Sequence, residues 1–272
     1  MYKTFYGLND TPFNVTPDSK YFFPSEKHTE ALDSLIYTIN ERKGFAVITG
    51  EIGAGKTTVW HMLLNSLDAG TKIALITNSR LTPKQMVMAI LDDFGIPFKD
   101  NWTKVRLLFL LNKFLIEQIN LGFNVVLVID EAQNLNAGVL EEVRMLSNLE
   151  TDKEKLIQII LIGQPELKDI LELEKLTQLK QRIAVYYHIY PLSKEEVTKY
   201  IEHRIKKAGF NNGQMLFDQN ALDKISFCSK GIPRLINSIC DRSLLTGFTR
   251  EIKIVGGDII EETARELKVI TI

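Results

Sequence analysis

The sequence predicts an α/β fold in three layers, with a parallel sheet between two layers of helices, followed by a small all-helical domain. Short apolar runs alternate with longer helical patterns up to about residue 190. Continuous apolar strands separated by helices are typical of a parallel sheet that is covered on both faces. After Pro191 the strand patterns stop and helical patterns continue, so the predicted domains are residues 1–190 and 191–272.

Periodicity and capping residues assign the elements in chain order. The predicted strands are residues 45–49, 72–77, 125–129, 156–162 and 184–189. The predicted helices of the first domain are residues 26–42, 57–67, 82–94, 104–121 and 139–149, and those of the second are residues 193–208, 218–228, 233–248 and 258–267. Ser25 and Thr82 stand where helix N-caps are expected, and Pro83 suits a first helical turn.

The first 25 residues differ from the rest of the chain because they are rich in aromatic residues and prolines. Proline is incompatible with a helix interior, so this segment is not expected to form a regular helix. Its aromatic side chains predict an ordered arm that packs on the body of the protein.

Composition excludes several classes of protein. The formal net charge is −1, so no global basic field indicates a nucleic-acid partner. Cys228 and Cys240 lack metal or redox spacing and are expected to be buried free thiols. No leader pattern is visible, and the most apolar stretch, residues 107–116, is far shorter than the roughly 18 residues of a membrane span. A soluble cytoplasmic protein is therefore expected, with recruitment to the inner membrane left open.

A phosphate-binding motif lies between the first strand and the next helix. Residues 50–57 read GEIGAGKT and match GxxxxGK[ST] at every position. Glycines let backbone N–H groups point at phosphate oxygens, and the helix N-terminus adds a positive dipole. Lys56 would carry the charge between the outer phosphates, the Thr57 hydroxyl would ligate Mg²⁺, and Thr58 would contact an inner phosphate. The predicted ATP-binding residues here are Gly50, Glu51, Ile52, Gly53, Ala54, Gly55, Lys56, Thr57 and Thr58. The alternative is a chance match in a glycine turn.

Two carboxylates follow the third strand. Residues 125–129 are apolar and lead directly into Asp130 and Glu131. Side chains at the carboxyl end of a parallel strand face the ligand crevice. Asp130 is expected to hold Mg²⁺, and Glu131 to orient and deprotonate the attacking water. The alternative is a solvated acidic turn. Together with the phosphate motif, Glu131 predicts a P-loop enzyme that hydrolyses ATP as well as binding it.

Three motifs carry a resemblance to a known family. They are GEIGAGKT, VVLVIDEAQNL and GIPRLIN, and FYGLNDTPF near the N-terminus and LIGQPEL extend the match over almost the whole chain. The sequence resembles the AAA+ ATPases, in particular the bacterial group of the general secretion pathway protein A type. The resemblance implies a P-loop NTPase sheet domain with a helical lid, and ATP and Mg²⁺ as its cofactors.

The resemblance also implies roles for polar residues near the nucleotide. Gln164, after the fourth strand, stands at the position of the γ-phosphate sensor, where asparagine, serine or threonine is usual. Asn78, after the second strand, matches a position that can restrain the catalytic glutamate. His28 lies where N-terminal arms of such proteins line the adenine pocket. Each has a structural alternative: a polar strand end for Gln164, a turn for Asn78 and a packed histidine for His28.

The resemblance also implies roles for two arginines, which would connect the nucleotide to a neighbouring subunit and to the helical lid. Arg182 matches the arginine that reaches into the site of a neighbouring subunit, with Lys180 as its local competitor, and Arg234 matches the lid arginine that senses nucleotide. The alternatives are a surface salt bridge for Arg182 and a helix brace for Arg234. If the family roles hold, the protein is an ATP-dependent homo-oligomer, a ring or a filament.

The expected function is an ATP-hydrolysing AAA+ motor or switch that serves a bacterial secretion or type IV pilus-type envelope assembly. One alternative is a DNA-binding ATPase of the transposition-regulator type. Its candidate contacts form a loose basic cluster: Arg80, Lys84, Lys99, Lys104 and Arg106. A nucleotide-gated scaffold that barely turns over is the third hypothesis.

Overall fold

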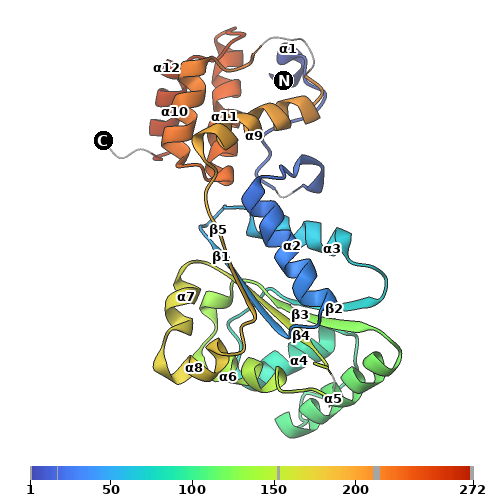
Figure 1. Cartoon of the computed structure of the whole chain (residues 1–272). Coiled ribbons are helices and arrows are strands. Elements are labelled where there is room, and N and C mark those ends of the chain that lie inside the picture. The colour runs from blue at the N-terminus through green and yellow to red at the C-terminus, as the bar shows by residue number, and fades with distance from the viewer. Residues whose placement is uncertain (1, 17, 152–153, 211–214, 270–272) are drawn as a thin grey trace. The chain divides into compact units, whose positions relative to one another are not determined.

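The computed structural model describes residues 2–16, 18–151, 154–210 and 215–269 (Figure 1). Contacts between residues divide the chain into two compact units. The sheet unit comprises Glu30–Gly50 and Met62–Ile189, and the helical unit comprises Met1–Thr29, Glu51–His61 and Tyr190–Ile272. The N-terminal arm and the glycine-rich loop therefore belong to the same compact unit as the C-terminal helices. The functional division at residue 190 stays a prediction.

The described part of the sheet unit forms one parallel five-stranded sheet in the order β2-β3-β4-β1-β5. Its strands are β1 (Phe45–Gly50), β2 (Thr71–Ile76), β3 (Asn124–Ile129), β4 (Gln158–Gly163) and β5 (Val185–Ile189). In register, Thr49 lies opposite Gly163 and Ile129 opposite Leu161, so the carboxyl ends of β1, β4 and β3 share one edge of the sheet. The predicted strands are confirmed to within two residues at each end.

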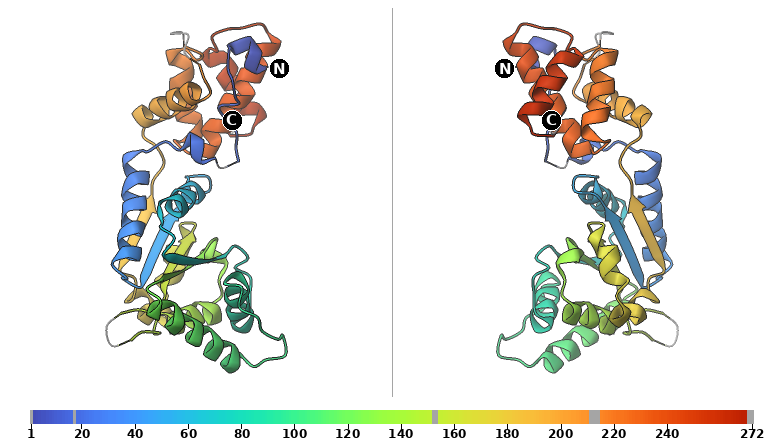
Figure 2. Two further views of the ribbon diagram at one scale, coloured as in Figure 1. Left: turned by 90° about the vertical axis from the view of Figure 1, so that its right-hand side faces the viewer. Right: turned by 90° about the vertical axis from the view of Figure 1, so that its left-hand side faces the viewer.

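Helices cover both faces of this sheet (Figure 2). The helices that lie wholly in the sheet unit are α4 (Pro83–Asp93), α5 (Lys104–Asn120), α6 (Ala137–Leu146), α7 (Glu166–Leu171) and α8 (Thr177–Lys180). Two further helices, α2 (Glu26–Asn40) and α3 (Lys56–Ser66), begin in the helical unit and end in the sheet unit. The predicted three-layer α/β class is confirmed. The short helices α7 and α8 were not predicted, because elements of one or two turns carry too little periodicity.

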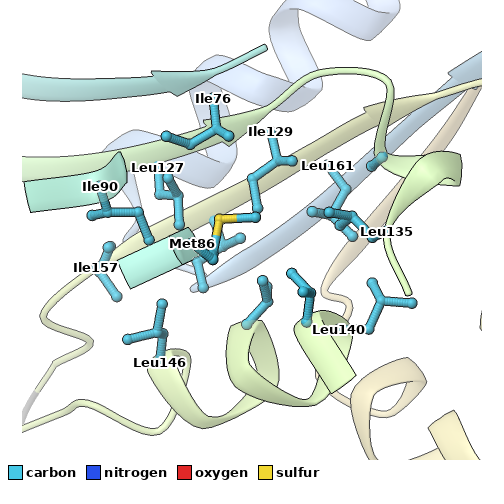
Figure 3. Packing of buried hydrophobic residues seen from close by; sticks show 14 of the residues in the cluster. Ile76, Met86, Ile90, Leu127, Ile129, Leu135, Leu140, Leu146, Ile157 and Leu161 are labelled. Atoms are coloured by element: carbon cyan, nitrogen blue, oxygen red, sulfur yellow. The ribbon is translucent and has the colours of Figure 1, made fainter. Parts of the chain in front are cut away.

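The core of the sheet unit explains the unbroken apolar sequence of β3. Alternate residues of a strand face opposite sides of the sheet. Val125, Leu127 and Ile129 pack into one cluster with α4 and α6 (Figure 3), and Val126 and Val128 are fully buried as well. A strand that is buried on both faces has no position for a polar side chain in its interior, and after Asn124 at the start of β3 the next polar residue is Asp130.

The helical unit contains the four predicted C-terminal helices around its own core. They are α9 (Lys194–Lys207), α10 (Gln219–Ser229), α11 (Pro233–Thr249) and α12 (Gly257–Glu266). Ser193 caps α9 in a capping box with Glu196, and Asp218 caps α10. Cys228 and Cys240 are free and buried in this core, as predicted.

The arm departs from its prediction at one end. Tyr2–Tyr6 forms helix α1, and Ser19–Tyr21 a 3-10 turn, so the expectation of no regular helix is wrong for the first residues. The prolines that argued against helix all lie beyond residue 11 and leave the first turn unconstrained. The expectation of an ordered, packed arm is confirmed, since Phe13 is fully buried against Phe217 of the helical unit. Among the described helices, none combines the length and apolar character that crossing a membrane requires.

Candidate functional site

The glycine-rich loop joins the end of β1 to the start of α3. Gly53 and Gly55 have φ of +81° and +101°, values that glycine adopts without the steric penalty of a Cβ. Lys56 opens α3, and its Nζ donates to the carbonyl oxygen of Glu51 at 3.0 Å. Thr57 is exposed and Thr58 half-buried in the first turn of the same helix. The loop thus has the backbone and the helix N-terminus that an anion site needs.

Arg234 adjoins this loop from the first turn of α11. Its backbone N–H donates to the carbonyl oxygen of Gly53 at 3.3 Å. A Cβ added to Gly53 would lie 2.5 Å from the Cβ of Arg234, so glycine is also needed here for close packing. Loop and helix belong to the same unit. The sensor role of Arg234 stays a prediction.

His28 also contacts the loop. Its Nε2 lies 2.9 Å from the carbonyl oxygen of Ala54, and its Nδ1 lies 2.6 Å from the hydroxyl of Ser25. Burial lowers the pKa of the imidazole, which favours the neutral ring. The neutral ring then donates from Nε2 to Ala54 and accepts at Nδ1 from Ser25, which also caps α2. The structure gives His28 a bracing role, and contact with adenine stays a prediction.

At the carboxyl end of β3, hydrogen bonds fix the backbone of Asp130 and Glu131. The N–H of Asp130 donates to Ile76 of the neighbouring strand, and the N–H of Glu131 donates to Oδ1 of Asp130 at 2.8 Å. Glu131 has φ +50° and ψ +40°, the left-handed region. That conformation costs a non-glycine residue roughly 1–2 kcal/mol. The hydroxyl of Ser79 secures it by donating to the Glu131 carbonyl oxygen at 2.9 Å.

Two glutamines meet the carboxylate of Glu131. Oε2 of Glu131 accepts from Nε2 of Gln133 at 2.5 Å and from Nε2 of Gln164 at 3.0 Å. The backbone N–H of Gln164 donates to Oε1 of Gln133 at 3.0 Å. The structure therefore brings Gln164, predicted as a sensor, to the predicted catalytic base. Gln133 was missed by sequence reasoning, and its only signal is its position two residues after Glu131.

The other predicted site residues of the sheet unit have local partners. Oδ1 of Asn78 accepts from the backbone N–H of Arg80 at 3.3 Å, which closes a turn. It is the next residue, Ser79, that reaches the peptide of Glu131. Lys180 pairs with Glu172 at 2.5 Å. The pKa of Glu150 is lowered first by its hydrogen bond with Lys155 and the charge of that residue, and the charge of the half-buried Arg182 adds to the effect. The roles of Asn78 at the glutamate and of Arg182 at a neighbouring subunit stay predictions.

The sheet order, the glycine-rich loop and the acidic end of β3 define a P-loop protein. Residues 39–171 match the family model described as an AAA domain. The chain therefore contains an AAA domain of the P-loop class.

A curated relative extends the match beyond that domain. The chain is 46% identical over 261 residues to the general secretion pathway protein A of Aeromonas hydrophila. The match covers 95% of this chain and 47% of the relative, so the chain spans about half the length of that protein.

Solved structures share the fold at low sequence identity. The ORC2 protein of Aeropyrum pernix, solved as ADPNP–ADP complexes, matches with a TM-score of 0.68 and 15% identity over 97% of this chain and 73% of that one. Cdc6p of Pyrobaculum aerophilum matches with a TM-score of 0.69 and 20% identity over 92% of this chain and 71% of that one. At these identities the comparison supports the fold alone.

Proposed function

We propose that this chain binds ATP with Mg²⁺ and hydrolyses the nucleotide as an oligomeric AAA+ motor or switch. The observation that carries the proposal is the strand order. β4 separates β1 from β3, and neighbouring strands are about 4.8 Å apart, so the loop begins about 10 Å from the acidic end of β3. A loop that binds phosphate and a carboxylate that activates water are thereby attached to the same sheet edge.

The residues of the loop fit a nucleotide triphosphate. Positive-φ glycines and the first turn of α3 supply backbone N–H donors, and Lys56 supplies a charge. The ammonium group of Lys56 donates a hydrogen bond to the Glu51 carbonyl oxygen within the loop. We expect it to exchange that partner for phosphate oxygens. Arg234 would report the nucleotide to the helices that follow it.

The Thr57 hydroxyl and the Asp130 carboxylate would each supply a hard oxygen ligand of the kind that Mg²⁺ prefers. When bound, Mg²⁺ would neutralise charge on the phosphates. Glu131 would accept the proton of the attacking water, with Gln164 beside it to contact the γ-phosphate. A positioned general base contributes about 10²- to 10⁴-fold in rate, and we assign this contribution to Glu131.

Assembly would complete the site through Arg182. An arginine that is supplied across an interface can raise the rate about 10³- to 10⁵-fold. We propose that ATP promotes self-association, and that self-association permits hydrolysis, in a ring or a filament.

The cellular role follows from the relative named for the general secretion pathway. We propose that this chain serves a bacterial secretion or type IV pilus-type envelope assembly, from the cytoplasm or recruited to the inner membrane. The alternative DNA partner has weaker support because several members of the basic cluster are already engaged. Lys104 pairs with the buried Glu142, Lys84 donates to the Asp100 carbonyl, and Arg106 stacks on Trp102.

The test is the steady-state ATPase rate as a function of protein concentration, for wild type and Glu131→Gln, with and without duplex DNA. We expect a rate per subunit that rises with concentration, needs Mg²⁺ and falls at least a hundredfold in the variant, at roughly the lower end of general-base effects. The variant should still bind ATP. A rate near zero at every concentration would contradict hydrolysis and favour a nucleotide-gated scaffold. Stimulation by DNA with steep salt dependence would favour the transposition-type alternative.

A further inference from the structure

We propose that Gln133 is a positioning residue that holds the carboxylate of Glu131 and joins it to Gln164 as one unit. The inference rests on the proposed function, because Glu131 is the catalytic base there. Gln133 uses both ends of its amide: Nε2 donates to Oε2 of Glu131 at 2.5 Å, and Oε1 accepts from the N–H of Gln164 at 3.0 Å. It therefore bridges the turn after β3 to the end of β4.

The geometry gives this bridge a defined task. Nε2 of Gln164 donates to the same Glu131 oxygen at 3.0 Å, which closes a ring of three hydrogen bonds. A carboxylate oxygen has two lone pairs, so two amide donors at Oε2 fix the plane of the carboxylate. Hydrogen bonds to a charged group are stronger than those between neutral groups. The backbone of Glu131 is already fixed by Asp130 and Ser79, so the glutamines restrain the remaining side-chain freedom.

The second bond of Gln133 couples the base to the predicted sensor. A Cβ on Gly163 would lie 3.0 Å from Oε1 of Gln133, so the glutamine packs closely on the end of β4. Any movement of Gln164 towards the γ-phosphate changes its hydrogen bond to the Glu131 carboxylate or its hydrogen bond to Gln133. The ring thus links phosphate contact by Gln164 to the orientation of Glu131.

Two substitutions separate the two bonds of Gln133. Gln133→Met keeps the length of the side chain and removes both. Gln133→Glu keeps an acceptor for the N–H of Gln164 but replaces the donor to Glu131 with a like-charged oxygen. We expect kcat to fall roughly ten- to hundredfold in Gln133→Met and further in Gln133→Glu, with the Kd for ATP unchanged within about twofold. The control is Gln219→Met. It removes an exposed hydrogen bond from the Gln219 side-chain amide to the Asp223 carboxylate at 3.1 Å and should leave kcat unchanged.

A double-mutant cycle tests the coupling. Because both amides hold one oxygen, Gln133→Met combined with Gln164→Met should lower kcat by less than the product of the single effects. In the ligand-free state, a crystal structure of Gln133→Met should show the Glu131 carboxylate rotated from its wild-type position, while the melting temperature stays within a few degrees of wild type.

The outcomes distinguish the inference from the proposed function. If wild type hydrolyses ATP and Gln133→Met has the same kcat, the positioning role is wrong. If Gln133→Glu keeps wild-type kcat while Gln133→Met loses it, Gln133 acts only through the backbone of Gln164. Strictly multiplicative effects would mean that the two glutamines act independently. If wild type does not hydrolyse ATP at all, it is the proposed function that fails.

Discussion

At the residue scale, His28 shows how one buried side chain can set the shape of a loop. A Cβ added to Gly55 would lie 2.6 Å from Nε2 of His28, so the imidazole ring and the loop are in direct contact. Both ring nitrogens have hydrogen-bond partners in the neutral form. Protonation would put a proton on Nδ1, where the hydroxyl of Ser25 would have to reverse its role.

This predicts a pH dependence of stability. The pKa of His28 is lowered, first by burial, while the Ala54 carbonyl and the charge of Glu196 act in the opposite direction. The unfolded chain, with a histidine pKa of about 6.5, therefore takes up the proton before the folded chain does. The stability contributed by the neutral ring is present above about pH 6.5 and is lost as the pH falls below it. His203, whose pKa is also lowered by burial, acts in the same direction.

The measurement is the melting temperature of wild type and His28→Gln from about pH 8 to about pH 5. An amide does not titrate, so the fall on acidification should be smaller in the variant, and smaller again when His203→Gln is added. A variant curve that parallels wild type throughout would mean that His28 does not titrate on unfolding.

At the element scale, the N-terminal arm is held to α9 by one buried cation. Nε of Arg204 donates to the Pro12 carbonyl at 2.5 Å, and Nη2 to the Asn14 carbonyl at 3.4 Å. The guanidinium also lies over the rings of Tyr21 and Tyr200, at 4.8 and 5.5 Å from their centroids. The planar fork satisfies several acceptors at once, which a point charge cannot do.

Arg204→Lys should therefore weaken the attachment of the arm although the charge is retained. We expect a loss of about 2–4 kcal/mol in the free energy of unfolding of the helical unit, because carbonyl groups lose their donors in a buried place. Urea denaturation measures the loss, and limited proteolysis should show faster cleavage within the first 24 residues. The matched control is Arg250→Lys, an exposed pair with Glu262, which should change stability by less than about 1 kcal/mol. Equal effects of the two substitutions would show that Arg204 does not anchor the arm.

At the scale of the whole molecule, the proposed mechanism needs two subunits for one complete site. Arg182 follows α8 and precedes β5, whereas Glu131 follows β3 on the other side of β4 and β1. A residue needed in trans can be supplied by a different polypeptide from the one that carries the base. Activity would therefore require the assembly of subunits in addition to the folding of each chain.

Mixing two inactive variants tests this directly. Arg182→Ala should hydrolyse ATP roughly a thousandfold more slowly than wild type, and Glu131→Gln at least roughly a hundredfold more slowly, the lower limits expected for an arginine finger and a general base. A mixture should regain activity, because some interfaces join an intact Glu131 to an intact Arg182 from the other variant. No recovery in mixtures that co-assemble by light scattering would place Arg182 in its own subunit's site. The same mixing with Lys180→Ala asks whether the neighbouring lysine has the role instead.

The sequence determined the fold class, the strands and the motif residues, because each depends on short-range patterns. The apolar run that ends at Asp130 is visible in the sequence, since a doubly buried strand tolerates polar groups only where it ends. The glycines before Lys56 are equally visible, because a left-handed backbone favours glycine.

Only the tertiary structure decided which side chains meet. Gln133 and Gln164 are 31 residues apart and share one carboxylate oxygen, and Arg204 reaches carbonyls more than 180 residues away. Ser79 rather than Asn78 reaches the peptide of Glu131, a difference of one position that depends on how the turn after β2 closes. Such contacts depend on strand order and on rotamers over long sequence separations, for which local propensity carries no information.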